Sequence, residues 1–92
     1  MNHLQREATT RERAILRWMH DCGAILVPAR EGTLYDLMGM GHRLTGVQPR
    51  IVSRMVDAAW VVAPPDGTPL YRITAAGRAV ATDKRARHGR AA

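Results

Sequence analysis

The fold of this chain is decided by residues 46–61, which read GVQPRIVSRMVDAAWV. Pro49 predicts a helix start, because proline is favoured at the first helical position, where its missing N–H would have no intrahelical partner. An apolar stripe at helical spacing follows, made of Val52, Met55, Val56 and Ala59. The stretch therefore predicts a helix that begins at Pro49 and is anchored from one side by aliphatic packing.

The other side of this predicted helix is polar and carries Gln48, Arg50, Ser53, Arg54 and Asp57. The major groove of B-DNA is about 12 Å wide and admits one helix whose exposed face is polar. Arginine can donate two hydrogen bonds to guanine and glutamine can pair with adenine, whereas Ser53 suits a phosphate or sugar contact. An ordinary solvated helix face is the alternative interpretation of the same residues.

Two short β-rich runs follow this helix. Residues 60–63 and 70–73 flank a loop with a turn signal at Asp66-Gly67. They predict a β-hairpin that packs on the helices through Trp60, Tyr71 and Ile73. Thr74 can then cap a last helix that extends to about Asp83.

The segment before residue 46 predicts two further helices and a short strand. Residues 9–12 read TTRE, a capping box, and open a helix over 10–22. Residues 24–27 read AILV and predict a short strand or extended segment that ends at Pro28. Apolar residues at helical spacing after Thr33 predict a helix over 33–43, weakened by its two glycines.

This order of elements resembles the winged helix-turn-helix family of bacterial DNA-binding regulators. The resemblance rests on V-S-R at residues 52–54 and Y-R-I-T-x-x-G-R at residues 71–78, and it covers about residues 10–82. It implies a mainly α fold with a small β-hairpin: a three-helix core, a wing and a C-terminal helix. It also implies sequence-specific binding of double-stranded DNA by a helix in the major groove, and a bacterial or phage repressor that regulates transcription. Such proteins commonly bind two half-sites as dimers, so a homodimer is a candidate assembly.

Length and charge set the expected organisation. The 92 residues suit one domain; we expect a flexible N-terminus over 1–8, the domain over 9–83 and a basic disordered tail over 84–92. The net charge is +6, from 14 basic and 8 acidic residues, and the tail supplies four of the basic ones. Three arginines and no carboxylate lie between residues 39 and 55. This local patch suits phosphate contacts.

Eight residues are the candidate DNA-binding positions: Arg43, Gln48, Arg50, Ser53, Arg54, Arg72, Arg85 and Arg87. In many relatives a basic wing tip enters the minor groove, but here Asp66 occupies that region and Arg72 is the only cation of the wing. The arginines of the tail either take over that role, as basic arms do elsewhere, or form only a solubilising end.

The sequence argues against an enzyme. It contains neither a Gly-rich phosphate loop nor an evident pair of nucleophile and base, and we expect no cofactor. His20-Asp21-Cys22 falls short of the roughly four ligands of a zinc site, so no metal is expected. The single cysteine excludes an intrachain disulfide and suits the cytoplasm. No apolar run approaches the roughly 20 residues of a membrane span.

Two alternative functions stay open beside DNA-binding regulation. The first is a protein-interaction module of the same fold, such as a phage-encoded factor that binds a host or regulatory protein or a nucleoprotein complex. The acid in the wing and the nearly neutral body favour it. The second is a recombination accessory factor that bends DNA.

Overall fold

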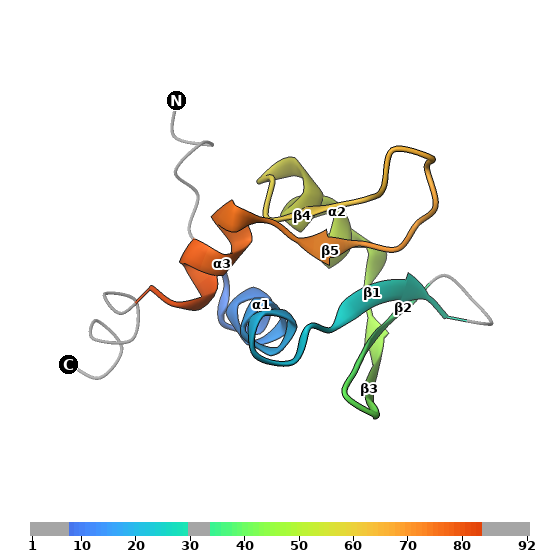
Figure 1. Cartoon of the computed structure of the whole chain (residues 1–92), viewed down its shortest axis with the longest axis horizontal. Coiled ribbons are helices and arrows are strands. Elements are labelled where there is room, and N and C mark those ends of the chain that lie inside the picture. Colours follow the sequence, from blue (N-terminus) through green and yellow to red (C-terminus); the bar gives the residue numbers. More distant parts are fainter. Residues whose placement is uncertain (1–7, 30–33, 84–92) are drawn as a thin grey trace.

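The computed structural model describes residues 8–29 and 34–83. Its elements in chain order are α1 (Thr10–Cys22), β1 (Ile25–Pro28), β2 (Tyr35–Gly39), β3 (His42–Val47), α2 (Pro49–Asp57), β4 (Val61–Val62), β5 (Arg72–Ile73) and α3 (Ala75–Ala81). Helices α1 and α3 lie side by side at one end, and the strands fill the other (Figure 1). Strands β1, β2 and β3 form one antiparallel sheet in that order, and β4 and β5 form a second.

Helix α1 begins and ends as its sequence predicts. The Thr9 hydroxyl accepts from the Glu12 amide at 3.1 Å, and the Glu12 carboxylate accepts from the Thr9 amide at 2.9 Å, which completes the capping box. Gly23, with φ of 65°, ends the helix in the left-handed conformation. Ile15, Leu16 and Met19 are buried, so the inward face of α1 contributes directly to the core.

The predicted helix over 33–43 is wrong. Residue 33 lies outside the described part, and residues 35–43 form strand β2, a turn and the start of β3. Leu37 pairs with both Leu26 and Leu44, so the apolar spacing that suggested one helix face instead places leucines opposite one another on adjacent strands. The two turn residues, Met40 and Gly41, have φ values of 53° and 77°, which is the backbone of a two-residue hairpin loop.

The expected mainly α fold with a three-helix core is therefore also wrong, because the described residues form three helices and five strands that include a three-stranded sheet. Gly39 supplies one physical reason. A Cβ at this position would lie 2.7 Å from the Ala24 Cα, so only glycine lets β2 approach the chain before β1 this closely.

The predicted hairpin after α2 is confirmed, with strands of only two residues each. It joins the first sheet through Leu26 and Tyr71, whose backbones exchange hydrogen bonds of 3.0 and 2.9 Å. The rings of Tyr35 and Tyr71 meet edge to face beside this bridge, with centroids 6.0 Å apart. Burial, and then the neighbouring Tyr71, raise the pKa of the Tyr35 hydroxyl.

The start of α3 explains the T-x-x-G pattern in the sequence. The Thr74 hydroxyl accepts from the Gly77 amide at 3.0 Å and donates to the Ala59 carbonyl at 2.6 Å. A Cβ on Gly77 would collide with the Trp60 carbonyl oxygen. The motif therefore caps α3 and fastens it to the turn after α2. The helix ends at Ala81, two residues before the predicted end.

Candidate nucleic-acid interface

Helix α2 presents its polar side to solvent and its apolar side to the core. Pro49 is its first residue, as predicted, and Val52 and Met55 are buried. Gln48, at the N-cap, makes no side-chain hydrogen bond to the helix, and Arg50 and Ser53 are exposed. The helix is therefore fixed from behind while the polar residues of its first turns face outward.

The predicted apolar stripe of α2 is narrower than expected. Val56 is 39% exposed, and Ala59 lies beyond the helix, exposed and with φ of 64°. A non-glycine residue rarely adopts this left-handed conformation. The chain turns there so that Trp60, which is 6% exposed, enters the core. The burial of this large ring offsets the strain at Ala59.

Arg54 faces a buried carboxylate from the first turn of α1. Its Nε lies 3.4 Å from Oε2 of Glu12, whose side chain is 1% exposed, whereas the Arg54 side chain is 42% exposed. The second carboxylate oxygen of Glu12 holds the capping box at the start of α1. One buried acid thus connects the first turn of α1 to the outer side of α2.

Arg43 is held in a similar way within the β2–β3 hairpin. Its Nη1 lies 3.5 Å from Oδ2 of Asp36, whose side chain is 9% exposed. The charge expected for residues 39–55 is therefore partly neutralised, because three arginines and these two carboxylates leave a local net charge of +1. The sequence gives no sign that these acids lie beside the arginines, because Glu12 and Asp36 both lie outside that segment.

Arg50 differs from Arg43 and Arg54, because it does not face a carboxylate in the described residues. It is exposed, and none of the ion pairs found in residues 8–29 and 34–83 includes it. It lies in the first turn of α2, where the positive end of the helix dipole adds to the potential. Arg50 is therefore the cation of this surface that is most available to an anionic partner.

The remaining predicted site residues lie elsewhere. Arg72 is exposed on β5, opposite Val62 of β4, and Arg85 and Arg87 lie outside the described residues. The Asp66 carboxylate accepts from the Thr68 amide at 2.9 Å, a bond that lowers the pKa of this carboxyl group. The tip of the β4–β5 loop therefore stays negatively charged at neutral pH, which disfavours contact with a phosphate.

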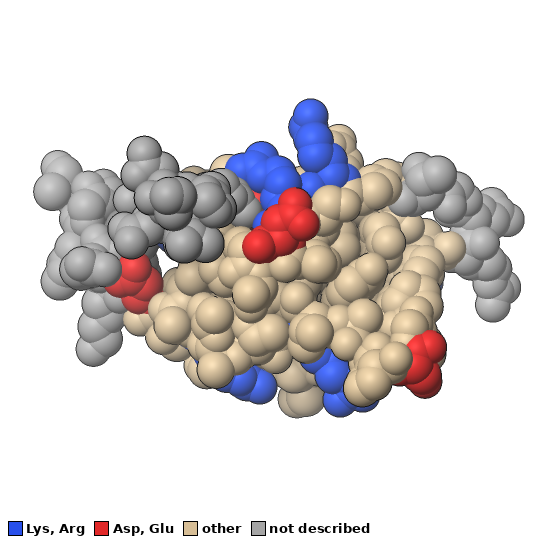
Figure 2. Space-filling view, turned by 90° about the horizontal axis from the view of Figure 1, so that it is seen from above, with Lys and Arg blue, Asp and Glu red and all other residues tan. Residues whose placement is uncertain are grey.

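The distribution of charge on one face is visible in Figure 2. Basic side chains gather in two groups on opposite edges of the view, and an acidic side chain lies against the upper group. A single continuous basic surface is not seen from this side.

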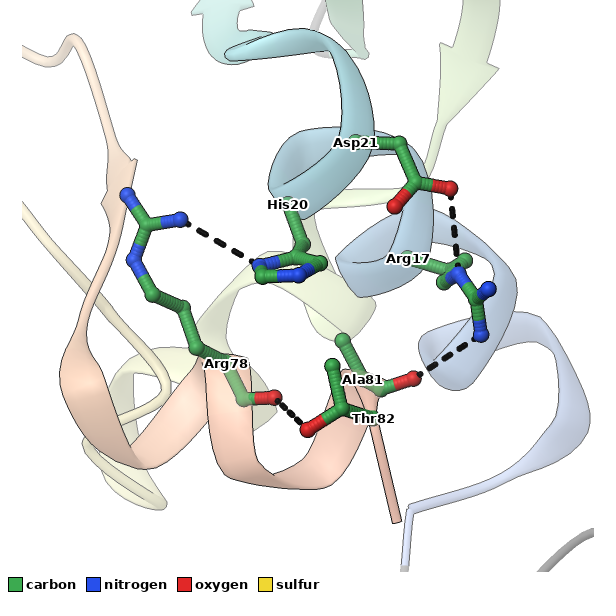
Figure 3. Close-up of polar contacts among 6 residues, drawn as sticks. All are labelled: Arg17, His20, Asp21, Arg78, Ala81 and Thr82. Atoms are coloured by element: carbon green, nitrogen blue, oxygen red, sulfur yellow. Dashed lines mark hydrogen bonds and ion pairs between the residues drawn. The ribbon is translucent and has the colours of Figure 1, made fainter. Parts of the chain in front are cut away.

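Two other arginines stabilise the contact between α1 and α3 (Figure 3). Arg17 pairs with Asp21 at 3.0 Å and reaches the Ala81 carbonyl at 3.5 Å. The guanidinium of Arg78 lies 3.3 Å from Nδ1 of His20. These contacts give both arginines a structural role at the end of the domain occupied by α1 and α3.

Other kinds of site find little support in the part of the chain that is described. It contains no group of three or more His, Cys, Asp or Glu side chains placed to hold a metal ion. Nor does it contain a helix with the length and apolar character needed to cross a bilayer.

No protein-family model, curated protein or solved structure matches the chain. The resemblance to winged helix-turn-helix regulators therefore rests on the two sequence motifs alone.

Proposed function

We propose that this protein binds double-stranded DNA through the outer side of α2. The observation that carries the proposal is Arg50, an exposed arginine in the first turn of a helix whose opposite side is anchored by Val52 and Met55. Gln48 and Ser53 flank it on the same solvent-facing surface. This surface, Gln48, Arg50 and Ser53, is called the α2 surface below.

The dimensions of α2 suit this role. A helix with its side chains is about 10–12 Å across, which fits the width of about 12 Å of a major groove, and α2 has nine residues. Arg50 and Gln48 carry the donors and acceptors that read guanine and adenine edges, and Ser53 suits a phosphate. Residues 37–56 contain no carboxylate, and with Asp36 and Glu12 counted against the three arginines the local charge is still +1, which favours a polyanion.

Control of transcription is the proposed consequence of such binding, and it would place the protein in the cytoplasm. This finer part of the proposal is supported by the motifs at residues 52–54 and 71–78 alone. Strand β3 leads directly into α2 and takes the place of the helix that was expected before it (Figure 1). The proposed binding through α2 therefore does not depend on a helix-turn-helix.

A protein partner is the second candidate, and one observation favours it. Val56 and Val62 are 39% and 53% exposed, and Asp57 is exposed at the end of α2. Apolar surface next to an acid suits a protein more than a phosphate backbone. Binding to DNA and binding to a protein differ in how affinity depends on salt, because only a polyanion releases condensed counterions on binding.

The test is fluorescence anisotropy of a labelled mixed-sequence duplex, titrated with the protein over a series of salt concentrations. We expect binding that weakens as salt rises, and we expect Arg50→Ala to lower the affinity and reduce the slope of log K against log salt by about 1. The matched control is Arg11→Ala, which removes the same charge from an exposed position of α1. Absence of salt-dependent binding, or an unchanged affinity in Arg50→Ala, would exclude the α2 surface.

A further inference from the structure

The tip of the β2–β3 hairpin combines exposure with backbone strain. Met40 is 74% exposed, against 53% for Val62, the next most exposed large apolar side chain in the described residues. Its φ is 53°, in the left-handed region that disfavours a residue with a long side chain. Two-residue loops of this type are dominated by Asn, Asp and Gly, which adopt it at lower cost. A methionine here is unfavourable both for solubility and for the turn.

We propose that Met40 is an apolar wedge that enters the minor groove of the duplex bound by α2 and inserts between two base pairs. The inference rests on the function proposed above and extends it to a second contact. Proteins that kink DNA use side chains of this kind, methionine among them, to unstack a base step. A wedge must be exposed and held at the end of a stiff support, which is the position of Met40 at the tip of a paired hairpin.

The charge around the tip suits a groove lined by phosphates. Gly39, Gly41 and His42 surround Met40 in the chain, so no acidic residue adjoins it. Arg43 follows on β3 with its side chain 59% exposed, beside the buried Asp36. The tip of the β4–β5 loop offers the opposite combination, because its Asp66 is exposed and negatively charged.

The spacing between the tip and α2 fits two adjacent grooves. Strand β3 has six residues and runs from the tip directly into α2 (Figure 1). At about 3.3 Å per residue it spans about 20 Å. One turn of B-DNA is about 34–36 Å, so the minor groove nearest to an occupied major groove lies about half a turn, roughly 17 Å, away. The length of β3 therefore matches the spacing between the two grooves.

The experiment measures affinity and bending together, on a duplex labelled with a donor and an acceptor dye at its two ends. We expect the wild-type protein to shorten the distance between the ends. We expect Met40→Gly to abolish the shortening and to weaken binding roughly tenfold, which corresponds to about 1.4 kcal/mol. Met40→Leu, which keeps an apolar wedge, should retain the bend. Glycine accepts a positive φ, so the melting temperature of Met40→Gly should not fall, and a folding defect cannot explain the loss.

Val62→Thr serves as the control, because it removes exposed apolar surface from β4 and should change neither quantity. Equal bending and affinity in Met40→Gly and the wild type would overturn the wedge while leaving the α2 surface intact. Failure of the wild-type protein to bind the duplex at low salt would overturn the wedge together with the proposed function. Binding by the wild type without a bend would overturn the wedge alone.

Discussion

Glu12 and Arg54 form an ion pair between helices α1 and α2. The Glu12 carboxylate is 1% exposed and uses one oxygen to close the capping box of α1 and the other to face the Arg54 guanidinium of α2 at 3.4 Å. A buried carboxylate without a cation would be costly, so Arg54 compensates the charge that the cap of α1 requires. An arginine that the sequence assigns to DNA recognition therefore also serves the stability of the fold.

Glu12→Gln should destabilise the domain through this ion pair. Glutamine can still close a capping box, so the change isolates the charge. We expect a loss of about 1–2 kcal/mol in the free energy of unfolding, below the 3–5 kcal/mol of a fully buried pair, because the half-exposed Arg54 is screened by solvent. Urea denaturation of the wild type and of Glu12→Gln measures this difference in the free energy of unfolding. In a double-mutant cycle with Arg54→Gln, additive effects would show that the two side chains are not coupled.

Asp36→Asn should strengthen duplex binding if the face that carries Arg43 contacts DNA. The substitution keeps the size of the buried side chain but removes the negative charge that lies 3.5 Å from Arg43. We expect the salt slope of binding to become steeper by up to about 1, the change attributed to one phosphate contact. Salt-dependent anisotropy provides the measurement, and Asp21→Asn, which frees Arg17 on α1, is the control. An unchanged slope would place Arg43 outside the interface.

Gly77→Ala should destabilise the domain strongly. The added Cβ would collide with the backbone oxygen of Trp60 and approach the Ile73 side chain to 2.7 Å, so α3 must move away from the turn that it fastens. Overpacking of this kind costs about 1–3 kcal/mol. Alanine has a higher helix propensity than glycine. A Gly77→Ala protein that is more stable than the wild type would therefore show that α3 can move away from Trp60 at little cost. Thermal melting followed by circular dichroism decides between these outcomes.

Ala59→Gly should stabilise the protein. Ala59 adopts φ of 64°, a conformation that costs a residue with a Cβ roughly 1–2 kcal/mol and glycine almost nothing. Part of the gain is lost to the greater entropy of glycine in the unfolded chain, so we expect a net increase of about 0.5–1 kcal/mol in the free energy of unfolding. Ala79→Gly, at an exposed position inside α3, should instead lower it by about 1 kcal/mol. A lower melting temperature for Ala59→Gly would contradict the assigned backbone.

The sequence alone determined the features that depend on contacts within a few residues. The capping box at Thr9, the helix start at Pro49 and the cap at Thr74 form as predicted. So does the β4–β5 hairpin around Asp66-Gly67. Each is specified by a hydrogen bond, a missing N–H or a turn conformation that only its own neighbours satisfy, and this is why a local pattern was sufficient.

Only the tertiary structure decided the form of residues 35–47 and the charge of the proposed interface. Leu37 and Leu44 are seven residues apart, a spacing that suits two turns of a helix and also two facing positions of a hairpin. Pairing with β1, and the close approach of Gly39 to Ala24, selected the hairpin. The acids that face Arg43 and Arg54 likewise come from other elements, and such contacts depend on how the chain packs.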